Sequence, residues 1–148
     1  DYGDKIMLVP MKVDYGVRAL VDLAMYGSDG KSLRSAEISE RTAIPNAYLA
    51  QVLHCLKKAG LVKSTRGPHG GHELAVDPDT IQISSVMEVL DGKDNLINCL
   101  DDDGFCVHSP YCAQKEIWMT VEDAIHGVLS AITVSDLARR TEFIKLQI

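Results

Sequence analysis

Cysteines are the side chains of this chain with the most distinctive chemistry, and three of the four lie close together: Cys99, Cys106 and Cys112, with Cys55 apart from them. In a chain without signs of export, clustered cysteines are more often metal ligands or redox groups than structural disulfides. The spacing C-x6-C-x5-C lacks the C-x2-C pair typical of structural zinc. Widely spaced thiolates suit a polynuclear core. The pattern therefore favours an iron–sulfur cluster, with zinc and directly oxidised free thiols as alternatives.

Charge distribution marks a second candidate site. The net charge is −6, yet residues 41–72 contain no Asp or Glu and carry five basic side chains: Arg41, Lys57, Lys58, Lys63 and Arg66. A basic segment inside an acidic protein indicates a footprint for a polyanion such as nucleic acid. The alternative is a solvated surface with a chance excess of bases.

The elements that must position the basic segment can be read from apolar spacing. It predicts three helices, over 15–26, over 36–42, and from Asn46 to a stop signal at Gly60. Each has a polar residue suited to cap its N-terminus: Asp14, Ser35 and Asn46. Two strands are predicted over 61–65 and 72–76, joined by a glycine-rich loop. Two short helices joined by a tight turn and followed by a basic hairpin predict a winged helix-turn-helix.

The second half of the chain is predicted to carry the cysteines and a long helix. Ser85 and Glu88 form a capping-box pattern that opens a fourth helix, ending near Asp91. Residues 93–112 show no periodicity, which is typical of a functional loop. A last helix is predicted over 113–132, with an apolar surface too wide for this small body to cover alone. A second copy of the chain is expected to cover the rest, which gives a homodimer.

These elements predict a mainly α fold with a small β-hairpin. We expect a winged helix-turn-helix DNA-binding domain over 7–80, and a region over 81–148 that holds the cysteine loop and the dimerisation helix. Residues 1–6 are interpreted as an extension. No apolar run approaches the length of a membrane span and no signal peptide is apparent, so we expect a cytoplasmic protein.

The predicted fold assigns roles in DNA binding. The second helix of the motif enters the major groove, where Asn46 and Gln51 can pair with adenine and Tyr48 can reach a phosphate or pack between helices. Lys57 and Lys63 are expected to contact phosphates. Arg66, beside Gly67 at the wing tip, is suited to a narrow minor groove. A nucleotide site in the wing loop is disfavoured, because neither a following helix nor a Lys-Ser/Thr pair accompanies the glycines.

Three stretches carry a resemblance to a known family: DYGVRAL at 14–20, IPNAYLAQVL at 44–53 and LKKAGLVKSTRGPHGGH at 56–72. They are similar to the bacterial winged-helix iron–sulfur transcriptional regulators related to IscR and NsrR, and the likeness runs from Met7 to about Arg140. The resemblance implies a homodimeric repressor or activator that binds a double-stranded DNA operator. It also implies that the three loop cysteines hold an iron–sulfur cluster that senses redox state, nitric oxide, oxygen or cluster supply.

The resemblance also bears on the fourth ligand of such a cluster. IscR-like relatives place a His three residues after the last Cys to complete a [2Fe–2S] site, but Lys115 stands there and an ammonium cannot ligate. NsrR-like relatives complete a [4Fe–4S] site with an Asp of the other subunit, just before the first helix, and Asp14 matches that position. The likeness thus favours [4Fe–4S] over [2Fe–2S]. His108 is a local alternative ligand, and a plain N-cap is the alternative role of Asp14.

Departures from the family pattern limit what is carried over. Ala50 stands where many relatives have Glu, so no operator preference is transferred, and His72 replaces a common Tyr. Cys55 falls near the apolar stripe of its helix and is expected to be a core thiol. No C-x-x-C, Ser-His-Asp pattern or paired carboxylates predict an enzyme. The alternative function is a cluster-free regulator of the same architecture that acts through thiol oxidation, or through a protein or metabolite partner.

Overall fold

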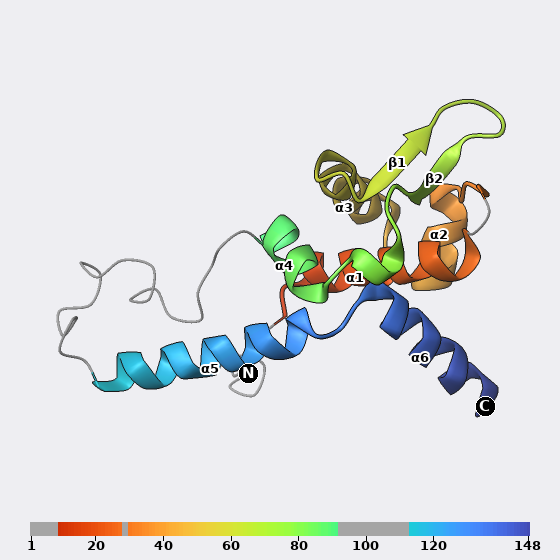
Figure 1. Ribbon diagram of the computed structural model, residues 1–148. Coiled ribbons are helices and arrows are strands. Elements are labelled where there is room, and N and C mark those ends of the chain that lie inside the picture. Colours follow the sequence, from red (N-terminus) through yellow and green to blue (C-terminus); the bar gives the residue numbers. More distant parts are fainter. Residues whose placement is uncertain (1–8, 28–29, 92–112) are drawn as a thin grey trace.

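A computed structural model describes residues 9–27, 30–91 and 113–148 (Figure 1). Within these ranges the helices are α1 (Met11–Tyr26), α2 (Ser35–Thr42), α3 (Asn46–Lys58), α4 (Ile83–Asp91), α5 (Ala113–Ser130) and α6 (Val134–Leu146), with a 3-10 turn over Pro78–Thr80. Strands β1 (Val62–Thr65) and β2 (Gly71–Leu74) pair antiparallel, Val62 opposite Leu74 and Thr65 opposite Gly71. The predicted mainly helical fold with a small hairpin is confirmed.

Helix α1 forms the centre of the fold, and α2, α3, α4 and α6 pack around it. Its side chains Leu20 and Leu23 are buried together with Leu49 and Leu56 of α3. Gly16 permits a close approach to α4, because a Cβ at this position would lie 2.1 Å from Leu90 Cδ1. This core fixes α3 against α1 and so holds the rest of the helix-turn-helix in place.

The N-termini of the first three helices differ from prediction. α1 begins at Met11 after Pro10, so Asp14 lies inside the first turn and is not the N-cap. Proline has the φ that a helix start requires, and the carbonyl of Pro10 accepts from the N–H groups of Val13 and Asp14. α2 and α3 likewise begin at Ser35 and Asn46 themselves, without a side-chain cap hydrogen bond. The three capping predictions were therefore wrong, although the helices were placed correctly.

The hairpin is tied to the segment that precedes α2. Leu33 and His72 exchange backbone hydrogen bonds, of 2.9 Å from the Leu33 N–H and 2.7 Å from the His72 N–H. Gly71 makes this contact possible, since a Cβ there would lie 2.7 Å from the Leu33 carbonyl oxygen. The wing is thereby anchored to the helix-turn-helix at its base.

The C-terminal region contains two helices where one was predicted. α5 ends at Ser130, and α6 starts after Thr133 with a capping box: Thr133 Oγ1 accepts from the Asp136 N–H at 3.1 Å, and Asp136 accepts from the Thr133 N–H at 3.0 Å. Both hydrogen bonds lower the pKa of Asp136. The predicted capping box at Ser85 is absent, because α4 already begins at Ile83. Val134 is fully buried, which places α6 in the core.

Helices α5 and α6 leave the body in different directions (Figure 1). α6 packs along α1, whereas only the end of α5 reaches α4 and no residue of α5 is buried. None of the helices in the described ranges is both long and apolar enough to cross a membrane.

Candidate nucleic-acid interface

Helix α3 presents one apolar and one polar face. Leu49, Val52, Leu53 and Leu56 are buried, while Asn46, Tyr48, Gln51, His54 and Lys57 are exposed. The turn before it is held tightly: Ala43 has a left-handed φ of 60°, and Ser39 Oγ donates to the Ile44 carbonyl at 2.5 Å. A non-glycine residue rarely adopts this φ, so the turn is set by the packing of buried Ile44. The exposed face is thus held rigidly for contact with another molecule.

Tyr48 lies at the beginning of that face and contacts α1. Its ring makes an edge contact with Tyr15, with centroids 5.8 Å apart, and the side chain remains 50% exposed. The Arg18 guanidinium lies 5.6 Å from the centroid of Tyr15. Tyr48 therefore packs between helices and still offers exposed surface to a ligand.

The wing extends the basic surface beyond α3. Arg66 and Gly67 are exposed at its tip, and Gly67 adopts a φ of 108° that only glycine tolerates readily. Arg34 donates to the Pro68 carbonyl and so ties the tip to the start of α2. Lys63 is exposed on β1, but its ammonium lies 3.5 Å from the Glu73 carboxylate. Of the two wing cations, Arg66 is thus the less compensated within the described residues.

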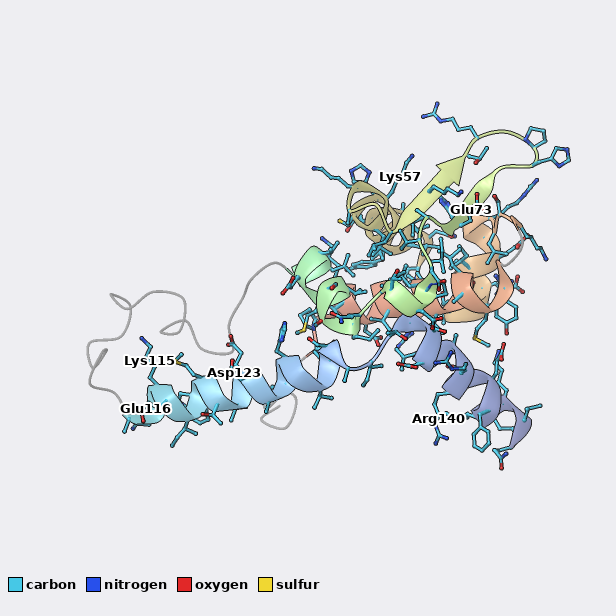
Figure 2. The ribbon with its side chains drawn as sticks, viewed as in Figure 1. Lys57, Glu73, Lys115, Glu116, Asp123 and Arg140 are labelled. Carbon is cyan, nitrogen blue, oxygen red and sulfur yellow. The ribbon has the colours of Figure 1, made fainter. Side chains whose placement is uncertain are left out.

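A cleft of about 410 Å³ separates α3 from the wing. Its lining contains no carboxylate: Ser35, Ala50, Leu53, His54, Lys57, Ser64, Thr65, Arg66 and His72. Figure 2 places Lys57 on α3 on this side of the molecule, away from α5 and α6. A cleft lined by cations and hydroxyls and lacking acids suits a phosphate backbone.

His72 forms one wall of this cleft and connects three elements. Its Nε2 is hydrogen-bonded to Ser35 Oγ at 2.9 Å, and its Nδ1 to Ser64 Oγ at 2.7 Å. Burial, and then the charge of Lys57, lower the pKa of His72, so the ring is neutral near pH 7. A neutral imidazole that bridges two hydroxyls fixes the wing relative to α2.

The predicted DNA-contacting residues divide into three groups. Lys57 and Arg66 line the cleft, and Lys63 and Gly67 lie on the wing outside its lining. Asn46, Tyr48 and Gln51 lie along the exposed face of α3. Sequence reasoning missed His54, Ser35, Ser64 and Thr65. For His54 a signal existed, because it lies three residues after Gln51 and three before Lys57, on the same side of the helix.

Arg41 belongs to the basic segment but not to this surface. Its guanidinium holds both carboxylate oxygens of Asp22 on α1, at 2.8 and 2.9 Å. The hydrogen bond to Asp22 raises the pKa of Arg41, since it stabilises the charged form. The expected footprint of residues 41–72 is therefore narrower than the sequence indicated.

The residues predicted to hold metal are described only in part. Cys99, Cys106, Cys112 and the alternative ligand His108 lie outside the described residues. Asp14 is half-exposed on α1, and its carboxylate lies 2.7 Å from Arg18. Within the described ranges no three His, Cys, Asp or Glu side chains converge as a metal site would require. Cys55 is half-buried against the core, in line with the expected core thiol.

Comparisons with known proteins agree on one family. Residues 9–140 match the family described as Rrf2, iron-dependent transcriptional regulator. The chain is 34% identical over 137 residues to the HTH-type transcriptional regulator CymR of Bacillus subtilis, across 92% of this chain and 93% of that protein. The solved structure of T. potens IscR is 32% identical with a TM-score of 0.75, covering 92% of this chain and 89% of that one. The oxidized form of Staphylococcus aureus CymR is 28% identical with a TM-score of 0.71, covering 89% and 96%.

Proposed function

Because the chain belongs to the Rrf2 family of winged-helix transcriptional regulators, it is a DNA-binding regulator and not an enzyme. We propose that it is a cytoplasmic homodimeric repressor whose DNA binding is controlled through its cysteine segment. The observation that carries the DNA-binding part is the acid-free cleft between α3 and the wing, with Lys57 on one wall and Arg66 on the other. In this proposal Asn46, Tyr48 and Gln51 reach base edges or sugar. Lys57, Lys63 and Arg66 contact the backbone and minor groove, beside Gly67.

The apolar surface of α5 supports the dimer. Large hydrophobic side chains that the single chain leaves exposed gather on this helix: Ile117, Trp118, Met119, Val121 and Val128. Ile117 is 57% and Val128 60% exposed, and exposed apolar side chains that gather on one helix are typical of a protein–protein interface. A second copy that packs α5 against α5 buries this surface and sets the distance between two winged helices. Half-sites about one helical turn apart would then be read together.

For the signal we propose an iron–sulfur cluster held by Cys99, Cys106 and Cys112, with Asp14 of the partner subunit as the fourth ligand. Three thiols and one carboxylate are a donor set that suits iron, and the family is described as iron-dependent. A cluster would supply a centre that reacts with nitric oxide or oxygen, and [4Fe–4S] is favoured over [2Fe–2S]. Asp14 would exchange its contact with Arg18 for the metal.

The alternative is a cluster-free regulator that responds to thiol oxidation. The solved structure of Staphylococcus aureus CymR in an oxidized form favours this second candidate, because that protein shares the fold of this chain. Both candidates use the same cysteines and differ in whether iron and sulfide are bound.

Anaerobic purification followed by iron and sulfide analysis and visible spectroscopy tests the proposal. Wild-type protein and Cys55→Ser should carry stoichiometric iron and sulfide, and Cys99→Ser, Cys106→Ser and Cys112→Ser should each lose them. Binding to a duplex selected from random sequence, at fixed salt, should change when the wild type is exposed to nitric oxide. If the purified protein contains no iron and its affinity for DNA changes on treatment with peroxide, the cluster mechanism is wrong and the thiol mechanism takes its place. Absence of sequence-specific duplex binding in every state would overturn the proposed function.

A further inference from the structure

A second pocket lies between α1 and α6, and Figure 1 shows the wing on the other side of α1 from α6. It is an open groove with a volume of about 530 Å³, lined by α1, the end of α2 and α6. Its apolar lining includes Val21 and Met25 from α1 and Leu137 from α6. A volume of this size lies within the range of small-molecule sites.

The charged groups of the pocket are mostly cationic. Arg18, Arg41 and Lys145 line it, with Asp22 as the one carboxylate of the lining. Asp22 is only 5% exposed and is held by both nitrogens of the Arg41 fork, so its charge is compensated inside the wall. The charge of Glu37 also raises the pKa of Arg41, and the Asp14 carboxylate forms an ion pair with Arg18. Lys145 has no carboxylate partner among the described residues.

The ring of Tyr26 contacts two cations from different helices, Arg41 of α2 and Lys145 of α6. The Arg41 guanidinium lies 4.6 Å and the Lys145 ammonium 5.1 Å from the centroid of its ring. Lys145 also donates a hydrogen bond to the Tyr26 hydroxyl. The Lys145 ammonium and the Tyr26 hydroxyl offer two hydrogen-bond donors to an anionic group. The Tyr26 ring and the apolar lining offer a surface to the apolar part of the same molecule.

We propose that this pocket binds a small organic carboxylate with an apolar tail, and that the bound molecule regulates DNA binding. The carboxylate would take the place beside Lys145 and the Tyr26 hydroxyl, and the tail would lie against Val21, Met25 and Leu137. Charge complementarity selects an anion, since the protein is acidic overall but this pocket is not.

The residues that line the pocket explain how a bound ligand would affect the DNA-binding surface. Arg41 and Thr42 end α2 immediately before the turn into α3, and Arg18 donates to the Thr42 carbonyl at 3.3 Å. α6 follows α5, the proposed dimer helix, through Thr133, the N-cap of α6. The ligand would contact α6 through Lys145 and Leu137, and it would face Arg41 of α2, whose guanidinium lies over the same Tyr26 ring. It would thereby bias the orientation of the winged helix relative to the dimer helix. This second half of the inference rests on the proposed function.

Calorimetric titration with decanoate tests the pocket without DNA. We expect binding of one decanoate per chain, weakened at least tenfold by Lys145→Gln, which removes the cation, and unchanged by Arg140→Gln. Arg140 is the matched control, because it is an exposed cation of α6 that stacks on Phe143 outside the pocket lining. Decanol, which lacks the charge, should bind the wild type as weakly as decanoate binds Lys145→Gln. No binding of decanoate to the wild type up to about 1 mM, or equal affinity for all three proteins, would overturn the site.

Regulation is tested separately, by duplex affinity with and without decanoate. The wild type and Arg140→Gln should show a shift, and Lys145→Gln should show none at the same decanoate concentration. If decanoate binds but the affinity for duplex does not change, the proposed regulation of DNA binding is wrong and the proposed ligand site still stands. Failure of the protein to bind duplex would refute the proposed function, and calorimetry would still decide the pocket.

Discussion

At the scale of single residues, substitution of Arg66 is the most direct test of the proposed DNA-binding surface. It lies at the wing tip and lines the cleft opposite Lys57. Arg66→Ala should weaken operator binding by about 1–3 kcal/mol, the value of one groove contact, and leave the melting temperature unchanged. Lys63→Ala should cost less, because Glu73 already compensates the Lys63 charge. Equal affinity of wild type and Arg66→Ala at fixed salt would remove Arg66 from the interface.

Asp14 is the residue whose structural role differs most from its predicted one. It does not cap α1, so Asp14→Asn loses only a half-exposed pair with Arg18, a change of about 1 kcal/mol or less. The same variant should alter the visible spectrum of the anaerobic protein and speed its reaction with nitric oxide, since an amide ligates iron poorly.

Arg18→Gln is the matched control for this test. It breaks the same pair and keeps the carboxylate, so its spectrum and reaction rate should match the wild type. A wild-type spectrum and rate in Asp14→Asn would exclude Asp14 as a ligand and leave His108 as the leading candidate.

At the scale of elements, the contact of α1 with α4 depends on Gly16. A Cβ at this position would lie 2.1 Å from Leu90 Cδ1 and 3.6 Å from Val52 Cγ1. The close atom is the end of the Leu90 side chain, which can change rotamer, so Gly16→Ala should lower the free energy of unfolding by about 1 kcal/mol or less, the cost of moving that side chain being partly offset by the better helix propensity of alanine. Chemical denaturation measures the change.

A double-mutant cycle identifies the cause. Leu90→Ala removes the atom that the new methyl group meets, so Gly16→Ala should cost less in a Leu90→Ala background than in the wild type. Additive losses in the two backgrounds would show that the α1–α4 contact is not the source of the effect.

At the scale of the whole molecule, the exposed α5 surface decides the quaternary state. Replacing both Val121 and Val128 by Glu should convert the dimer to a monomer in sedimentation at micromolar concentration, because the charges would be buried against a second copy. Far-ultraviolet circular dichroism should stay close to the wild type, since neither side chain belongs to the core of the single chain. A monomeric wild type under the same conditions would contradict the proposed dimer.

Local patterns were enough to determine the order of the helices and strands up to α5. Apolar residues at helical spacing, Gly60 as a stop and the glycines of the wing loop act over a few residues, and each of the predicted helices and strands is found near its expected place. The residues exposed on α3 also follow from periodicity, since the buried stripe of Leu49, Val52, Leu53 and Leu56 leaves the other side to solvent. The family resemblance rested on the same local strings.

Contacts between distant residues decided the rest. Arg41 counts as a basic residue of the motif in the sequence, but Asp22, nineteen positions earlier, neutralises it. His72 becomes a tie between α2 and β1 only because folding brings Ser35 and Ser64 to its two nitrogens. The pocket beside Tyr26 needs Lys145, which lies 119 positions away on a helix that apolar spacing did not predict. Such pairings depend on how the helices pack around α1, and local periodicity carries no information about that packing.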